Sequence, residues 1–106
     1  MQIEVPWQGR VIGFYGHERQ SMIHMEECGE LIQAISKMRR AFDDSTIDGG
    51  EAYSNLVEEV ADVCISIEQL QEMYGISDRE IQWVVDKKCA RQEERIHDAL
   101  RRNLEG

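Results

Sequence analysis

Two pairs of acidic residues fall where the helices of this chain are expected to be apolar. Glu27 and Glu30 form one pair, Glu59 and Asp62 form the other, and each pair is spaced three residues apart. Residues at this spacing share one face of a helix. At about 100° per residue, Glu27 and Glu59 each lie within about 40° of a largely apolar stripe. The stripes comprise Ile23, Leu31, Ala34 and Met38 around Glu27, and Val63, Ser66, Leu70 and Met73 around Glu59.

Two such helices packed face to face would gather the four carboxylates into one interior cluster. Carboxylates cannot share a site of low dielectric constant without compensation of their charge. A hard divalent cation is the natural compensator because it prefers oxygen ligands. A carboxylate-bound cation is typical of enzymes that act on phosphate groups. The acid pairs therefore predict a metal site with phosphate chemistry.

The length and charge of the chain limit the other classes of function. With 106 residues, 42% hydrophobic and 31% charged, the sequence predicts a single globular domain over residues 1–106. The net charge of −9 leaves no large basic patch for nucleic acid or an anionic membrane. We find neither a signal-like segment nor an apolar run of about 18 residues. We therefore expect a soluble, cytoplasmic protein.

The periodicity and the helix-ending residues predict an all-α fold. Pro6 is the single proline and precedes every long helix, so long uninterrupted helices are permitted. Gly75 is typical of a helix C-terminus, and Ser77 with Glu80 is typical of a capping box that begins a helix. We expect a four-helix, bundle-like domain that assembles into an oligomer. The expected helices cover about residues 8–15, 18–41, 51–74 and 78–102, with a loop over 42–50.

The last expected helix carries charge of the opposite sign. Lys88, Gln92 and Arg95 fall on the same stripe as Ile81, so the two cations are expected to lean inward. Lys88 and Arg95 would neutralise the phosphates of a nucleotide whose triphosphate bridges the metal site. The sequence contains neither a G-x-x-x-x-G-K-[S/T] loop nor a G-x-G-x-x-G motif, so the nucleotide sites built on those loops are not expected.

These residues resemble the motifs of a known enzyme superfamily. Glu26, Glu27 and Glu30, followed after 28 residues by Glu59 and Asp62, are similar to the acid motifs of the MazG-like, all-α nucleoside triphosphate pyrophosphohydrolases. That superfamily includes dimeric dUTPases and dCTP pyrophosphatases. The resemblance covers about residues 14–97. It includes Lys37 after the first motif and a segment, Lys88 to Arg95, similar to the family's Lys-x₃-Asn-x₂-Arg, with Gln92 in place of Asn.

The resemblance implies an activity and a role for each of these residues. Members hydrolyse (d)NTPs to (d)NMPs and pyrophosphate with Mg²⁺ or Mn²⁺, often to clean the nucleotide pool, and form dimers or tetramers. The nucleoside triphosphate substrate would be cleaved between its α and β phosphates. By this analogy Glu27, Glu30, Glu59 and Asp62 are metal ligands and catalytic residues. Lys88, Gln92, Arg95 and Lys37 would bind the substrate.

Several alternatives stay open at the level of the sequence. Trp7, with Phe14 and Tyr15, is a candidate for stacking on the nucleobase, although core or dimer packing is the commoner use of such rings. A di-iron carboxylate bundle needs paired Glu-x-x-His motifs, and only Glu94 with His97 supplies one. A non-catalytic helical module for nucleotide binding or protein interaction is the other alternative.

Overall fold

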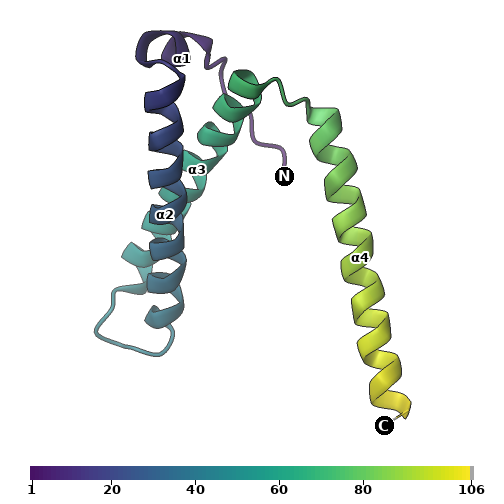
Figure 1. Cartoon of the computed structure of the whole chain (residues 1–106). Helices are drawn as coiled ribbons and strands as arrows, with labels where there is room; N and C mark the ends of the chain where they lie inside the picture. Colours follow the sequence, from purple (N-terminus) through teal and green to yellow (C-terminus); the bar gives the residue numbers. More distant parts are fainter. Residues whose placement is uncertain (106) are drawn as a thin grey trace. The chain divides into compact units, whose positions relative to one another are not determined.

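The chain is all-helical over the residues that the computed structural model describes, 1–105, which confirms the predicted all-α class. The chain divides into two compact units, Met1–Gly75 and the segment from Ile76 onward, and each is described by itself. The single domain and the four-helix, MazG-type bundle stay predictions. The helices are α1 (Gly9–Tyr15), α2 (His17–Ala41), α3 (Gly49–Tyr74) and α4 (Asp78–Glu105) (Figure 1).

The ends of α3 follow from two local interactions. One carboxylate oxygen of Asp48 accepts hydrogen bonds from the backbone N–H groups of Gly50 and Glu51, at 3.0 and 3.1 Å. This N-cap begins the helix at Gly49, two residues before the expected start, because the cap satisfies amides that would otherwise lack partners. The helix ends at Gly75, whose φ of 66° is left-handed, as the glycine at this position predicted.

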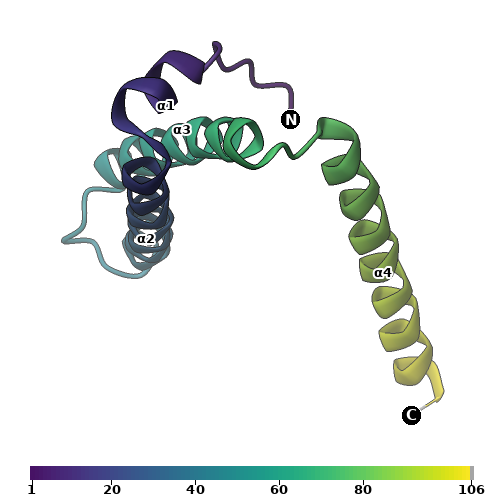
Figure 2. The same cartoon turned by 45° about the horizontal axis from the view of Figure 1, so that its top comes forward.

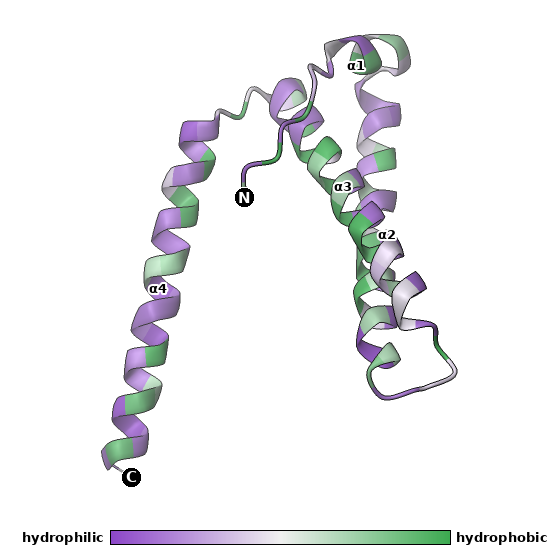
Figure 3. Ribbon diagram, turned by 180° about the vertical axis from the view of Figure 1, so that it is seen from behind, coloured by the Kyte–Doolittle hydropathy of each residue, from purple (hydrophilic) through white to green (hydrophobic). Residues whose placement is uncertain are grey.

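The start of α4 confirms the predicted capping box. The Ser77 hydroxyl accepts a hydrogen bond from the Glu80 N–H at 3.1 Å, and the Glu80 carboxylate accepts one from the Ser77 N–H at 2.8 Å. The helix continues to Glu105, beyond the expected end at about 102, and none of its described residues is buried. Apolar and polar residues alternate along it (Figure 3). Within residues 1–105 we find no helix that combines the length and hydropathy needed to cross a membrane.

The first unit is a helical hairpin with a short helix at its open end. The loop after Ala41 returns the chain so that α3 runs antiparallel to α2, and α1 packs against both (Figures 1 and 2). Ile12 of α1 is buried there, and Ala34 and Ala52 are buried between the two long helices. The stripes predicted around Glu27 and Glu59 are buried or half-buried throughout, so the periodicity identified the inward faces of both helices correctly.

Polar side chains occupy a large part of the contact between α2 and α3. His24 Nδ1 lies 2.9 Å from Ser66 Oγ, and Gln20 Nε2 donates a hydrogen bond to Gln69 Oε1 at 2.9 Å. Gln69 Nε2 in turn donates to Gln8 Oε1 at 2.9 Å, which extends the chain of amides to the start of α1. Gln20, His24, Ser66 and Gln69 are all buried, whereas another contact between the two helices, from Ser21 Oγ to Tyr74 OH at 3.3 Å, is exposed. Sequence analysis did not predict this network, which we call the polar seam.

The polar seam continues in register to the acidic residues. Gln20 faces Gln69 and His24 faces Ser66, so the paired residue numbers add to 89 or 90. The electrostatic partners Glu27–Asp62 and Glu30–Glu59 obey the same rule. Along each helix these residues follow one another at intervals of three or four, so they all lie on the side of the helix that faces the other helix. One register therefore aligns both the hydrogen bonds and the carboxylates.

The polar seam makes stability dependent on pH through His24. Burial lowers the pKa of His24, with a hydrogen bond to Gln69 acting in the opposite sense, so the folded state favours the neutral ring. Below about pH 6.5 the unfolded chain takes up a proton that the folded chain resists, and the stabilisation is lost as pH falls toward the lowered folded value. We predict that the free energy of unfolding falls less between about pH 7.5 and 5.5 in His24→Gln than in the wild type.

Urea unfolding of the wild type and of His24→Gln at both pH values measures the effect. Comparison with the variant is needed because the pKa values of Glu27 and Glu59 are raised, so these carboxylates favour the folded state as pH falls, in the opposite direction to His24. An equal loss of unfolding free energy in the two proteins would contradict the assignment of the effect to His24.

Candidate metal and phosphate site

The hairpin brings acidic residues from both helices into one cluster. Glu27 and Glu30 of α2 and Glu59 of α3 each place one carboxylate oxygen within 4.8 Å of the others. The charge of Asp62 acts on both Glu27 and Glu59, which places it beside the other three. We call these four residues the acid cluster. The structure thus gathers the four acids that the sequence singled out, while their roles as metal ligands and catalysts stay predictions.

The acid cluster is electrostatically strained. Burial, then the charges of Asp62 and Glu30, raise the pKa of Glu27. Burial, then the charges of Glu30 and Asp62, raise the pKa of Glu59. One carboxylate oxygen, Oε2, of each of these two glutamates is buried without a hydrogen-bond partner. Among the described residues these two oxygens are therefore unsatisfied, and the surroundings oppose ionisation of both glutamates.

The donor set fits a hard divalent cation. The acid cluster offers carboxylate oxygens from two facing helices, which are the ligands that Mg²⁺ and Mn²⁺ prefer, and it includes neither imidazole nor thiolate. The two unpartnered buried oxygens of Glu27 and Glu59 are the atoms that such an ion would satisfy. A cation would also reverse the direction of the carboxylate pKa shifts, because opposite charge favours ionisation.

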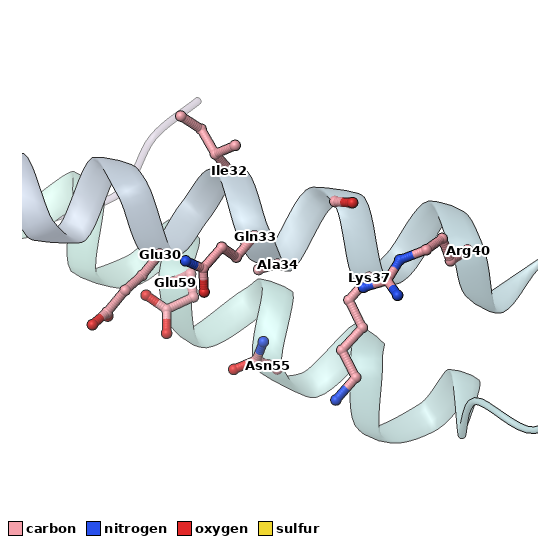
Figure 4. Close-up of a pocket in the computed structure, with 9 residues that line it drawn as sticks. Glu30, Ile32, Gln33, Ala34, Lys37, Arg40, Asn55 and Glu59 are labelled. Carbon is pink, nitrogen blue, oxygen red and sulfur yellow. The ribbon is translucent and has the colours of Figure 1, made fainter.

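An open pocket of about 810 Å³ extends from the acid cluster along α2. Figure 4 shows the carboxylates of Glu30 and Glu59 at one end, Asn55 in the middle, and Lys37 and Arg40 at the other end. The floor is Ala34, which is buried. The pocket is therefore polarised, with negative charge at one end and positive charge at the other. Its lining consists of Glu30, Ile32, Gln33, Ala34, Ser36, Lys37, Arg40, Asn55 and Glu59.

The predicted substrate-binding residues fall in three places. Lys37 lines the pocket. Trp7 is 74% exposed and lies outside the pocket lining; a Cβ on Gly9 would fall 2.0 Å from its indole, so glycine permits this close approach. Lys88, Gln92 and Arg95 are exposed on α4, in the other unit.

Sequence analysis missed Arg40 and Asn55. Arg40 follows Glu30 by ten residues and Lys37 by three, so these residues share one side of α2. The stripe centred on Glu27 includes neither Lys37 nor Arg40, which lie about 80° and about 140° from Glu27 around the helix. Asn55 precedes Glu59 by one turn of α3 and lies about 40° from it, within the stripe, but its neutral amide gave no sign of a charged site. The spacing was a usable signal for both residues.

Comparison of the chain with models of protein families, with curated proteins and with solved structures finds no match. The resemblance to the pyrophosphohydrolases therefore depends on the motif residues themselves.

The strain in the acid cluster generates a prediction about stability. Glu59→Gln removes one of the mutually repelling charges, so we expect the metal-free variant to melt at a higher temperature than the wild type. Mg²⁺ or Mn²⁺ should raise the melting temperature of the wild type, because a ligand at a hundredfold excess over its Kd adds about 2.7 kcal/mol to the free energy of unfolding. The melting temperature of Glu59→Gln should rise far less. Thermal melts with EDTA and with added metal measure both effects.

Glu58→Gln is the matched control because Glu58 is exposed beside Glu59 and outside the acid cluster. It should leave the metal-induced gain in place. A gain in melting temperature that is equal in wild type and Glu59→Gln would show that the metal binds elsewhere.

Proposed function

We propose that this protein is a Mg²⁺-dependent nucleoside triphosphate pyrophosphohydrolase, converting (d)NTP to (d)NMP and pyrophosphate. The observation that carries the proposal is the acid cluster, in which facing helices place unpartnered carboxylate oxygens beside a pocket with two cations at its far end. The resemblance of the acid motifs to the MazG-like enzymes supports the choice of reaction. Removal of non-standard or surplus nucleotides from the cell's pool is the proposed role, with Mn²⁺ as an alternative metal.

Glu27, Glu30, Glu59 and Asp62 would hold the metal, which when bound supplies charge that polarises the phosphates and acidifies water. A carboxylate of the acid cluster whose pKa is raised, Glu27 or Glu59, is suited to accept a proton from the attacking water. The water oxygen forms a bond to the α phosphorus, and the bond from this phosphorus to the α–β bridging oxygen breaks. Pyrophosphate leaves with that oxygen, so no side chain needs to act as a nucleophile.

We also propose that the active form is a homodimer or homotetramer. Several large apolar side chains of the hairpin are exposed within its own unit, and contiguous exposed apolar surface is typical of subunit interfaces. Association would cover these residues and supply the missing part of a bundle. They are Met22, Met25, Ile32 and Ile35 on α2, and Val57, Val60, Ile65 and Ile67 on α3.

The reaction is tested with a panel of common NTPs and dNTPs in the presence of Mg²⁺ or EDTA, with products separated by chromatography. We expect monophosphate and pyrophosphate, and loss of both with EDTA. Glu27→Gln should lower kcat by about a hundredfold or more, because it removes a ligand and a candidate base. Glu26→Gln is the matched control, since Glu26 is exposed next to Glu27 and outside the acid cluster.

Other products would refute the assignment in distinct ways. Diphosphate with inorganic phosphate would keep the metal site but contradict the cleaved bond. Nucleotide binding without hydrolysis of any substrate would favour the non-catalytic module. Purified protein that contains iron would favour the di-iron alternative, although Glu94 and His97 are exposed on α4 and belong to no metal-binding group among residues 1–105.

The oligomer is tested by sedimentation velocity, from which we expect a mass of two or four chains of 12.3 kDa each. The apolar side chains exposed on α2 and α3 are the physical reason. A monomer mass at micromolar concentration would contradict the proposed assembly without bearing on the reaction.

A further inference from the structure

The cationic end of the pocket contains two side chains that no acidic group neutralises. Within residues 1–105 the only ion pair joins Arg101 to Asp98, so neither Lys37 nor Arg40 has a carboxylate within 4.0 Å. The charge of Asp44 interacts with that of Arg40. Hydrogen bonds from Thr46 are the main cause that lowers the pKa of Asp44, and the Arg40 charge contributes less. One oxygen of Asp44, Oδ1, accepts hydrogen bonds from the Thr46 hydroxyl and N–H at 2.6 and 2.9 Å, and Asp44 forms no ion pair with Arg40.

The residues around these cations keep them available. A glutamate four residues before a lysine or arginine is the usual way to neutralise it on a helix. Here Gln33 precedes Lys37 by four residues and Ser36 precedes Arg40, and both are neutral. Across the pocket α3 presents Asn55, which is also neutral (Figure 4). In a chain of net charge −9, two such cations facing one pocket are suited to bind an external anion.

The pocket's geometry indicates which anion. Glu30 and Lys37 are separated by two turns of α2, about 10 Å along the helix axis, and Arg40 lies almost one turn further. A single phosphate group is too short to contact a cation in the acid cluster and also Arg40. A chain of phosphates is long enough to do both, and would lie with one phosphate at the acidic end, where the acid cluster would hold a metal, and the distal phosphates toward Lys37 and Arg40.

We infer that Lys37, Arg40 and Asn55 form the subsite for the β and γ phosphates of the substrate and for the pyrophosphate that leaves. The inference builds on the proposed function and adds the direction in which the substrate lies along α2. Arg40 binds the terminal phosphate in a two-pronged contact, Lys37 supplies a second charge, and the Asn55 amide donates a hydrogen bond between them. The substrate class is therefore the nucleoside triphosphates. Nucleoside diphosphates lack the γ phosphate, so they leave Arg40 without a partner and bind more weakly.

Binding of inorganic tripolyphosphate and pyrophosphate in the presence of Mg²⁺, measured by calorimetry, tests the subsite without catalysis. Arg40→Gln should weaken both by about tenfold, the loss expected for one charge-assisted hydrogen bond at an accessible site. Arg39→Gln is the matched control, because Arg39 is the exposed neighbour that does not line the pocket, and it should leave binding unchanged. Arg40→Lys keeps the charge and should retain most of the affinity. Circular dichroism verifies that each variant is folded.

The outcomes separate this inference from the proposed function. Equal binding by Arg39→Gln and Arg40→Gln would overturn the subsite, even where the wild type hydrolyses NTPs. Arg40-dependent binding of tripolyphosphate would support the subsite, even where the wild type hydrolyses nothing and the proposed function fails. In an active enzyme, Arg40→Gln should raise KM for the triphosphate about tenfold and leave inhibition by the nucleoside monophosphate unchanged.

Discussion

The structure of the hairpin depends on the register of the polar seam between α2 and α3. Buried polar groups are costly unless they are paired, and here Gln20 pairs with Gln69 and His24 with Ser66. A shift of one residue would break both pairs at once. Few apolar residues are fully buried beside them, so hydrogen bonding determines the register more than apolar volume does. The same register places Glu27 opposite Asp62 and Glu30 opposite Glu59.

The acid cluster is thus a consequence of how the fold is specified, and it weakens that fold. Burial and the charges of neighbouring acids raise the pKa of the glutamates at the two half-buried positions, 27 and 59, where leucine or alanine would pack without charge. The hydrogen-bonded pairs of the polar seam hold the two helices in the register that brings these carboxylates together. A bound cation would relieve this repulsion, which is the physical basis of the proposal that these acids bind a metal.

The sequence predicted what depends on local spacing and failed where contacts join distant residues. The start of α4 at Ser77, the end of α3 at Gly75 and the inward faces of both long helices follow from periodicity and caps. The amide chain through Gln69 was not predictable, because glutamine gives no periodic signal and its partners are 49 and 61 residues away. The stripe of α4 identifies an amphipathic face, but periodicity does not specify which surface covers such a face.

The candidate site shows the same division between local and distant information. The four acids were found because carboxylates are out of place on an apolar stripe. Lys37 was part of the motif resemblance, but Arg40 was not, and long cationic side chains on a helix usually project into water. The significance of Arg40 comes from neutral Ser36 one turn before it in the sequence, and from Asn55 across the pocket, which only the fold brings near. An absent ion pair is informative only when the structure shows which carboxylates lie within reach, so Arg40 and Asn55 emerge from the fold and not from the motif.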